Sequence, residues 1–264
     1  MKKFIASLLV FCLMAALWGC GSITIQLGNS DNDKTQDSPA KQKTATLEGP
    51  GFDTPEDAIV AYAEALKKGD VQKILSTFAI ESYVKNFDLE AYLEQNRVYS
   101  ISIQIPFPVT DEYTTELAKI SRQAFIVRSL SNMYLSLGDL EDPYAPVNFN
   151  GSPYNRPAEL IEDITIDNWM DMLSKMKIGD VHTAEAFSSN LDALNNNMKR
   201  QANALGCSEL VPLAVEVTLD GVEYYLCADI ACYDGRWYVC NQLGTIASIL
   251  GADSLTGGLF RRED

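Results

Sequence analysis

Four residues in the C-terminal part of the chain have side chains suited to binding a polar ligand: Tyr225, Asp229, Arg236 and Tyr238. The carboxylate and the guanidinium carry opposite charges, and the two phenol groups both donate and accept hydrogen bonds. We therefore expect a ligand site that combines these residues. The alternative is a solvent-facing ion pair between Asp229 and Arg236, which would contribute less than about 1 kcal/mol to stability.

Two Asp-Gly pairs divide the sequence around these residues into three β-rich runs. Asp220-Gly221 and Asp234-Gly235 are typical of two-residue hairpin turns. The sequence therefore predicts a C-terminal three-stranded antiparallel meander.

The two turns also set the register of this meander. Leu219 opposes Val222 and Tyr233 opposes Arg236, so the period of two assigns every side chain to one of two faces. One face is mixed in polarity and carries the four candidate ligand residues. The other face is apolar and must be covered by helices; its members are Leu213, Val215, Val217, Leu219, Val222, Tyr224, Leu226, Ala228, Ile230, Cys232, Trp237 and Val239.

Capping residues predict two helices at the start of the folded part. Thr54 is a hydroxyl N-cap followed by Pro55, and Gly69 suits the left-handed C-cap. Asp70 then caps a second helix. The apolar stripe of the first helix consists of Ile59, Tyr62, Ala63 and Leu66.

The middle of the chain is expected to be mostly helical. A long helix begins at Thr110 or Asp111 and ends at Gly138, and residues 98–108 suit an edge strand or an extended insertion. The apolar stripe of the long helix consists of Tyr113, Leu117, Ile120, Ala124, Val127 and Tyr134. Shorter helices are expected over residues 88–95, 168–177 and 183–205, and a long loop over residues 139–157.

The two helices on either side of Gly69-Asp70, together with the Asp-Gly-Arg-Trp-Tyr-Val pattern at residues 234–239, resemble the nuclear transport factor 2-like, or cystatin-like, α+β cone. The resemblance implies helices packed on a curved antiparallel sheet around a pocket. It implies no single function, because this superfamily includes enzymes, ligand carriers and interaction modules. Residues 98–206 go beyond a minimal member and are expected to form a large, mostly helical insertion.

The N-terminal segment predicts export and lipid attachment. Lys2 and Lys3 precede an apolar run over residues 4–18 that is too short for a comfortable membrane span. The run ends in Leu17-Trp18-Gly19-Cys20, which resembles the lipobox of bacterial lipoproteins, with Trp18 as a departure from the usual residue type. The resemblance implies that Cys20 receives the lipid. An uncleaved anchor helix and an ordinary secretory signal are the alternatives.

These observations divide the chain into three parts. Residues 1–19 are expected to be the signal peptide, residues 20–50 the lipidated Cys20 and a flexible tether, and residues 51–264 a single α+β domain. The expected location is the outer face of the bacterial cell membrane, to which the lipid on Cys20 anchors the protein.

The chain is strongly acidic, with 21 Lys and Arg against 36 Asp and Glu and a formal net charge of −15. Because proteins bind nucleic acid through clustered Lys and Arg, this composition argues against a nucleic-acid partner. An acidic domain on a flexible tether is expected to be a monomer.

The remaining titratable residues form no metal-binding or catalytic motif, so we expect neither a metal nor a cofactor. His182 is the only histidine, and we expect it to be a surface residue at a helix entry. As a catalytic base it would need an orienting carboxylate that the sequence does not locate. Four cysteines of the folded part either stay reduced or form at least one disulfide; they are Cys207, Cys227, Cys232 and Cys240.

The sequence thus predicts a lipid-anchored envelope protein that binds a small ligand or another envelope protein without catalysis. The alternative is a small envelope enzyme of the polyketide-cyclase or isomerase kind, which would use an Asp and a Tyr of a pocket as an acid–base pair.

Overall fold

The computed structural model describes residues 47–96, 108–137, 169–252 and 256–262, all of which belong to the compact unit Ala45–Asp264. The predicted signal peptide, Cys20 and most of the tether lie outside the described residues, as do the predicted loop at 139–157 and nearly all of the predicted strand at 98–108. Among the described residues, no helix combines the length and the apolar character needed to cross a bilayer.

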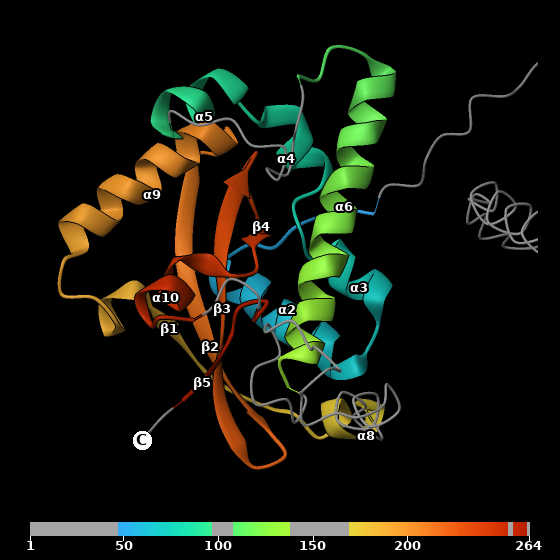
Figure 1. The fold of residues 1–264 in the computed structure, drawn as a ribbon, viewed down its shortest axis with the longest axis vertical. Helices are drawn as coiled ribbons and strands as arrows, with labels where there is room; N and C mark the ends of the chain where they lie inside the picture. The colour runs from blue at the N-terminus through green and yellow to red at the C-terminus, as the bar shows by residue number, and fades with distance from the viewer. Residues whose placement is uncertain (1–46, 97–107, 138–168, 253–255, 263–264) are drawn as a thin grey trace, which may run out of the picture. The chain divides into compact units, whose positions relative to one another are not determined.

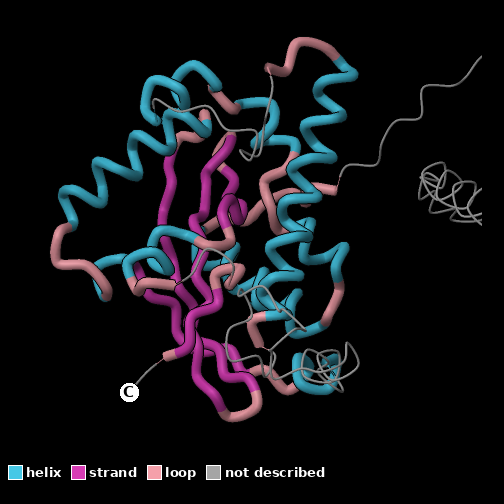
Figure 2. The backbone as a smooth tube through the Cα atoms, in the orientation of Figure 1, coloured by secondary structure: helices cyan, strands magenta, loops and turns pink. Residues whose placement is uncertain are grey.

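The sheet is antiparallel and has the order β1-β2-β3-β4, with β5 paired to β3 (Figure 1). Both predicted hairpins are confirmed, since Leu219 pairs with Val222 and Tyr233 with Arg236, and the predicted register holds throughout β2–β3 and as far as Ile230 in β3–β4. The turn between β2 and β3 lies at the lower end of the view in Figure 2. The strands are β1 (Lys177–Thr183), β2 (Glu209–Leu219), β3 (Val222–Tyr233), β4 (Arg236–Asn241) and β5 (Leu259–Arg261).

The backbone explains why Asp-Gly occupies both hairpin turns. Asp220 and Gly221 have φ of 47° and 81°, and Asp234 and Gly235 have φ of 51° and 77°. Two consecutive positive φ values define a type I′ turn, which matches the twist of the flanking strands and which Asp and Gly tolerate best.

The first two helices follow their predicted caps. The Thr54 hydroxyl accepts a hydrogen bond from Asp57 N, and Gly69 ends the helix in the left-handed conformation. The Asp70 side chain accepts from Lys73 N at the start of the next helix. The described helices are α2 (Pro55–Lys68), α3 (Val71–Ser76), α4 (Glu81–Asn86), α5 (Leu89–Asn96), α6 (Glu112–Leu135), α8 (Trp169–Ser174), η1 (Ala184–Ala186), α9 (Leu191–Leu205) and α10 (Gly244–Ile249).

The predicted apolar face of the sheet is confirmed as the core. Leu213, Val215 and Ile230 are fully buried and belong to one apolar cluster with residues of α2, α3 and α6. In that cluster the rings of Tyr62 and Phe78 meet edge to face, with their centroids 5.2 Å apart. Burial of this face is the main apolar contribution to folding.

The second, mixed face of the sheet is also largely covered by helices. One cluster joins Tyr233, Tyr238 and Cys240 to residues of α4 and α9, and another joins Ala214 and Cys227 to residues of α9 and α10. We call the part of this face that lies under α4, α9 and α10 the closed half. The small and aromatic side chains of the closed half pack against these helices. The alternation in the sequence shows that this face is mixed in polarity, but it does not show that helices cover it.

Helix α6 begins where expected, with a capping box between Asp111 and Thr114, but the prediction of its buried stripe is wrong. Tyr113 is 71% exposed and Ile120 is 56% exposed. The buried stripe instead consists of Ala118, Arg122, Ile126, Leu130 and Met133.

Helix α6 buries this side because of Arg122, whose side chain is completely buried. Its Nε donates to the Ala79 carbonyl at 3.1 Å, its Nη2 donates to the Cys240 carbonyl, and its Cζ lies 4.2 Å from the centre of the Tyr83 ring. These interactions turn α6 so that a charged residue faces inward, which an apolar pattern does not reveal.

The region between α8 and α9 also differs from its prediction. Residues 177–183 form strand β1 and not a link between two helices, so this part of the expected insertion belongs to the sheet. The helix predicted from residue 183 begins only at Leu191, because the Asn190 side chain caps it by accepting from Ala193 N.

Candidate functional site

The structure places the four predicted ligand residues at three separate positions. Asp229 is 2% exposed and lies beneath the first turn of α10. Its Oδ1 accepts from Thr245 N at 2.8 Å, and its Oδ2 accepts from Thr245 Oγ1 at 3.3 Å and from Asn241 Nδ2 at 3.4 Å. Burial raises the pKa of Asp229 to about 6, and the bonds from Thr245 and Asn241 oppose that rise. Asp229 therefore holds the start of α10 on the sheet.

Arg236 and Tyr238 lie together, but they contact the segment that precedes α2. Arg236 Nε donates to the Pro50 carbonyl at 3.1 Å, Nη2 donates to the Gly51 carbonyl at 2.6 Å, and Nη1 pairs with the Asp53 carboxylate. Gly51 has φ of 73°, and a Cβ there would lie 2.6 Å from Cζ of Tyr238. The two residues thus fasten this segment to β4.

A β-bulge moves Cys240 out of the register that the predicted hairpin between β3 and β4 implies. Asp229 pairs with Asn241 and Ile230 with Val239, so Cys240 is the extra residue and does not oppose Asp229 as the simple register predicts. All four cysteines of the folded part are free thiols in the structure. Burial raises the pKa of Cys207 and Cys227 to about 12 and that of Cys240 to about 11, so these thiols are protonated at neutral pH and are poor nucleophiles.

Tyr225, the fourth predicted residue, belongs to a different group of side chains on the second face of the sheet. We call this group the Glu216 cluster; it consists of His182, Phe187, Glu216, Tyr225 and Arg262. Glu216 Oε1 lies 3.0 Å from His182 Nε2 and accepts from Arg262 Nη1 at 3.1 Å. The side chains of Glu216 and His182 are 30% and 29% exposed. Most of their surface is therefore packed against the protein, and the rest is open to solvent.

Three rings form the apolar part of the Glu216 cluster. The centroid distances are 5.1 Å between Phe187 and Tyr225, 5.8 Å between His182 and Tyr225, and 6.1 Å between His182 and Phe187. All three pairs meet edge to face, which is the favoured geometry for aromatic side chains. The rings therefore hold one another in fixed orientations beside the Glu216 carboxylate.

The sheet explains why these residues meet. The β1–β2 pairing is irregular between Ile178 and Val181, and a Cβ on Gly179 would lie 3.2 Å from Oε2 of Glu216. The absence of a side chain at Gly179 leaves room for the carboxylate to reach His182. On the other side, β5 pairs with β3, and Arg262 N donates to the Glu223 carbonyl at 2.9 Å, which brings the Arg262 side chain to the cluster.

Sequence reasoning located Tyr225 but missed the partner of His182. The missing carboxylate is Glu216, which the meander register already assigned to the same face as Tyr225. Recognising the pair requires that residues 177–183 form a strand beside β2, and the Gly179-Asp180 interruption hides that strand from a test of alternation. The contact between Arg262 and Glu216 depends on the pairing of β5 with β3, which the sequence around Arg262 does not indicate.

Two grooves lie elsewhere in the described part of the chain. The larger, of about 510 Å³, runs between α9 and the start of β2; the residues that line it are Asn195, Met198, Lys199, Ala202, Asn203, Cys207, Ser208, Glu209 and Leu210. The second, of about 430 Å³, lies between α4, the start of α5 and the segment that enters α6. Neither groove contains a histidine or a pair of carboxylates.

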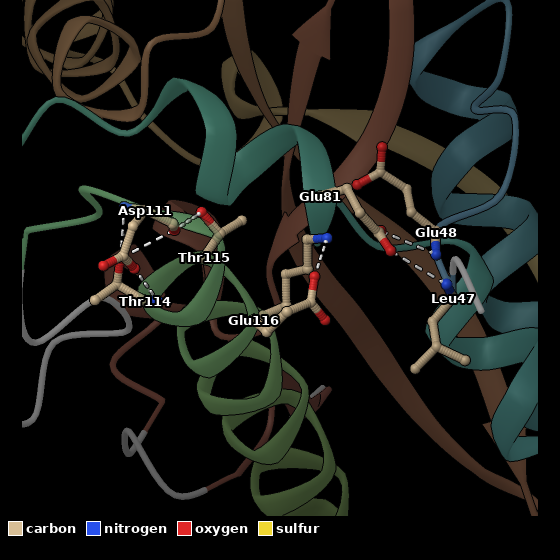
Figure 3. Close-up of polar contacts among 8 residues, drawn as sticks. Leu47, Glu48, Glu81, Asp111, Thr114, Thr115 and Glu116 are labelled. Atoms are coloured by element: carbon tan, nitrogen blue, oxygen red, sulfur yellow. Dashed lines mark hydrogen bonds and ion pairs between the residues drawn. The ribbon is translucent and has the colours of Figure 1, made fainter. Parts of the chain in front are cut away.

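The polar contacts in Figure 3 join the Glu81 side chain at the start of α4 to the segment at residues 47–48, and they cap the start of α6. Leu47 N and Glu48 N donate to the Glu81 carboxylate at 3.3 Å and 3.2 Å. Thr114 N donates to Asp111 Oδ1 at 2.8 Å. These bonds satisfy backbone groups, so they have a structural role. Across the described ranges, no group of three or more His, Cys, Asp or Glu side chains is arranged to hold a metal ion.

Comparison with known proteins gives no family for this chain. No protein-family model matches it, and no curated protein is similar to it. A solved structure that is similar is a cystatin-like protein from Ruminococcus gnavus, with a TM-score of 0.44 and 14% sequence identity over 80% of this chain. The chain spans 45% of the length of that protein. The fold class therefore rests on the observed elements: helices packed on an open antiparallel sheet with a C-terminal meander.

Proposed function

We propose that this protein is exported, is anchored to the outer face of the cell membrane through a lipid on Cys20, and binds a ligand at the Glu216 cluster without catalysis. The ligand is a small molecule or an exposed group of another envelope protein. The observation that carries the binding role is the Glu216 cluster itself, in which a carboxylate, a histidine and two further rings are held together yet remain open to solvent.

The contrast with the rest of the second face supports this choice. Asp229, Arg236 and Tyr238 already have partners within the chain that fasten α10 and the segment before α2. Glu216 is 30% exposed, so a ligand reaches it without the displacement of a helix. Ligand sites typically combine rigid aromatic surface with a few polar groups, as this cluster does.

The titratable groups favour binding over catalysis. The thiol of Cys207, which lines the larger groove, has its pKa raised to about 12 by burial. The second candidate function, an enzyme of the polyketide-cyclase or isomerase kind, is favoured by one observation, the pKa of Asp229 near 6. Because that carboxyl is 2% exposed and bonded to Thr245 and Asn241, a substrate would reach it only after α10 moved away.

The anchoring part of the proposal is supported by the sequence at residues 2–20, where two lysines, an apolar run and a lipobox-like Leu17-Trp18-Gly19-Cys20 follow one another. Two acyl chains on one cysteine would be sufficient for stable attachment. Metabolic labelling of cells with a fatty acid tests it: the wild-type chain is expected to carry the label and Cys20→Ser is not. Label on Cys20→Ser, or no label on the wild type, contradicts lipid attachment at this residue.

A thermal-shift screen of the full chain in detergent tests the binding part, because a ligand that binds the folded state raises the melting temperature. The screen uses anionic, neutral and cationic metabolites together with envelope glycans. Hits are expected to lose their shift in Glu216→Gln and to keep it in Glu209→Gln, a matched change on the same strand that lies in the larger groove. Loss of the shift in Glu209→Gln alone would place the site in that groove and overturn the assignment to the Glu216 cluster.

A further inference from the structure

The Glu216 cluster already contains a positively charged group that belongs to the chain itself. Arg262 Nη1 lies 3.1 Å from Glu216 Oε1 and 3.3 Å from Glu223 Oε2. The Arg262 guanidinium carbon lies 5.6 Å from the centre of the Tyr225 ring. A guanidinium between two carboxylates and over a tyrosine face is the arrangement in which proteins bind planar cations.

Every other group that faces this guanidinium suits a cation as well. Glu216 and Glu223 supply two negative charges, Tyr225 supplies the negative face of its ring, and His182 Nε2 contacts the same Glu216 oxygen as Arg262 does. The chain as a whole has a formal net charge of −15, so its field attracts cations and repels anions. The site and the whole molecule therefore select the same sign of charge.

The contact with Arg262 is also easy to replace. The Arg262 side chain is 41% exposed and Glu223 is 59% exposed, and ion pairs with this much solvent access are weak. The backbone of the same residue is held separately, because Arg262 N donates to the Glu223 carbonyl. The side chain is thus free to leave the carboxylates while β5 stays in place.

We propose that the Glu216 cluster binds a guanidinium or alkylammonium group of a ligand. In the absence of the ligand the Arg262 side chain fills this site, and the ligand displaces it. The inference rests on the proposed binding function and names its ligand class. The chemistry is that of an arginine or lysine side chain, or of a small amine that carries the same group. Glu216 and Glu223 pair with the cation, and Tyr225 contacts its face.

The test uses Nα-acetyl-arginine amide, called arginine amide below, as the cationic probe and Nα-acetyl-citrulline amide, called citrulline amide below, as the control. Acetylation removes the α-ammonium charge from both probes, and citrulline replaces the guanidinium with a neutral urea of similar shape. His182 is the only histidine in the chain, so its ring proton signals in NMR spectra of the full-length protein in detergent report on this site alone. Dissociation constants are measured for the wild type, Arg262→Ala, Arg261→Ala and the Glu216→Gln/Arg262→Ala double variant. Arg261 is the matched control, because it carries the same charge on the neighbouring residue and pairs with Tyr224.

We expect arginine amide to bind Arg262→Ala at least about tenfold more tightly than it binds the wild type or Arg261→Ala, because an attached competitor acts at a high effective concentration. Binding should be lost in the double variant, and citrulline amide should not bind any of the proteins. Equal affinity of Arg262→Ala and the wild type, or equal binding of both probes, overturns the inference. Unchanged melting temperatures of the variants show that folding is not the cause.

The outcomes also separate this inference from the proposed function. If the thermal-shift screen yields anionic or neutral ligands that depend on Glu216, the binding function stands and the cationic ligand class is wrong. If no compound of any charge gives a shift that depends on Glu216, and Arg262→Ala does not bind arginine amide, both proposals fail.

Discussion

Asp229 and Glu216 lie on the same face of one sheet, yet the two carboxylates differ in their exposure to solvent and in their partners. Asp229 is 2% exposed, is covered by α10 and accepts three hydrogen bonds from the chain. Glu216 is 30% exposed and meets a histidine and an arginine at the surface. The comparison shows that strand alternation assigns a carboxylate to a face, whereas the helices above it decide between a structural and a binding role.

The largest expected effect concerns Arg122, which links α6 to Cys240 in the closed half of the face. Arg122→Ala removes the guanidinium that bonds the Ala79 and Cys240 carbonyls and leaves both acceptors buried without a partner. We expect the free energy of unfolding to fall by about 3 kcal/mol or more, from the unsatisfied carbonyls and the cavity together. Urea denaturation measures it, with Arg128→Ala on the exposed side of α6 as the control. A loss within about 0.5 kcal/mol of that control would show that Arg122 does not fix α6.

The next effect concerns Asp229 itself. Asp229→Ala leaves Thr245 N without its side-chain acceptor, so the free energy of unfolding should fall by about 2 kcal/mol. Denaturation at about pH 4 is the appropriate measurement, because the cost of burying this carboxyl develops between about pH 4 and about pH 6 and does not mask the loss at the lower limit. The matched change Glu209→Ala at an exposed position of β2 should cost no more than about 0.5 kcal/mol. Equal losses in the two variants would contradict a structural role for Asp229.

The same residue predicts a dependence of stability on pH. Burial raises the pKa of Asp229 from its ordinary value of 3.8 to about 6, so between these values the folded state binds more protons than the unfolded state. Stability therefore falls as pH rises from about 4 to about 6, by on the order of 3 kcal/mol from this group. In denaturation curves over this range the stability of the wild type should fall more steeply than that of Asp229→Asn, which keeps the contributions of other groups such as Glu48, whose pKa burial also raises. Parallel pH profiles would contradict the burial of this carboxyl.

The smallest expected effect concerns Glu216, whose side chain is 30% exposed. Glu216→Gln keeps the shape of the side chain and removes a charge that is partly exposed, so the free energy of unfolding should change by less than about 0.5 kcal/mol. Thermal unfolding of the full chain measures this. A loss as large as that of Asp229→Ala would mean that the Glu216 cluster holds the sheet together and is not a free binding surface.

Local signals in the sequence account for much of the fold. The Asp-Gly pairs predicted both hairpins, the register of β2 with β3, and the register of β3 with β4 as far as Ile230; Thr54 and Asp70 predicted the starts of α2 and α3. These predictions succeeded because turn and cap residues act through bonds to their immediate neighbours.

The errors about α6 and β1 have a different cause, since both elements depend on residues that are distant in sequence. The buried side of α6 is determined by bonds from Arg122 to Ala79 and Cys240, and the stripe of exposed apolar residues on the same helix gave the wrong answer. Strand β1 was missed because its irregular pairing at Gly179 breaks the alternation. Without β1, nothing in the sequence connects His182 with Glu216.

The measurement that tests the account most directly is the ligand-induced rise in melting temperature of the wild type, Glu216→Gln and Asp229→Asn with one set of ligands. The two variants change one carboxylate to its amide on the same face of the sheet, so they differ only in which position is altered. We predict that Glu216→Gln loses the rise in melting temperature and that Asp229→Asn keeps it. A rise that is lost in Asp229→Asn and kept in Glu216→Gln would contradict the account and would place the ligand beneath α10.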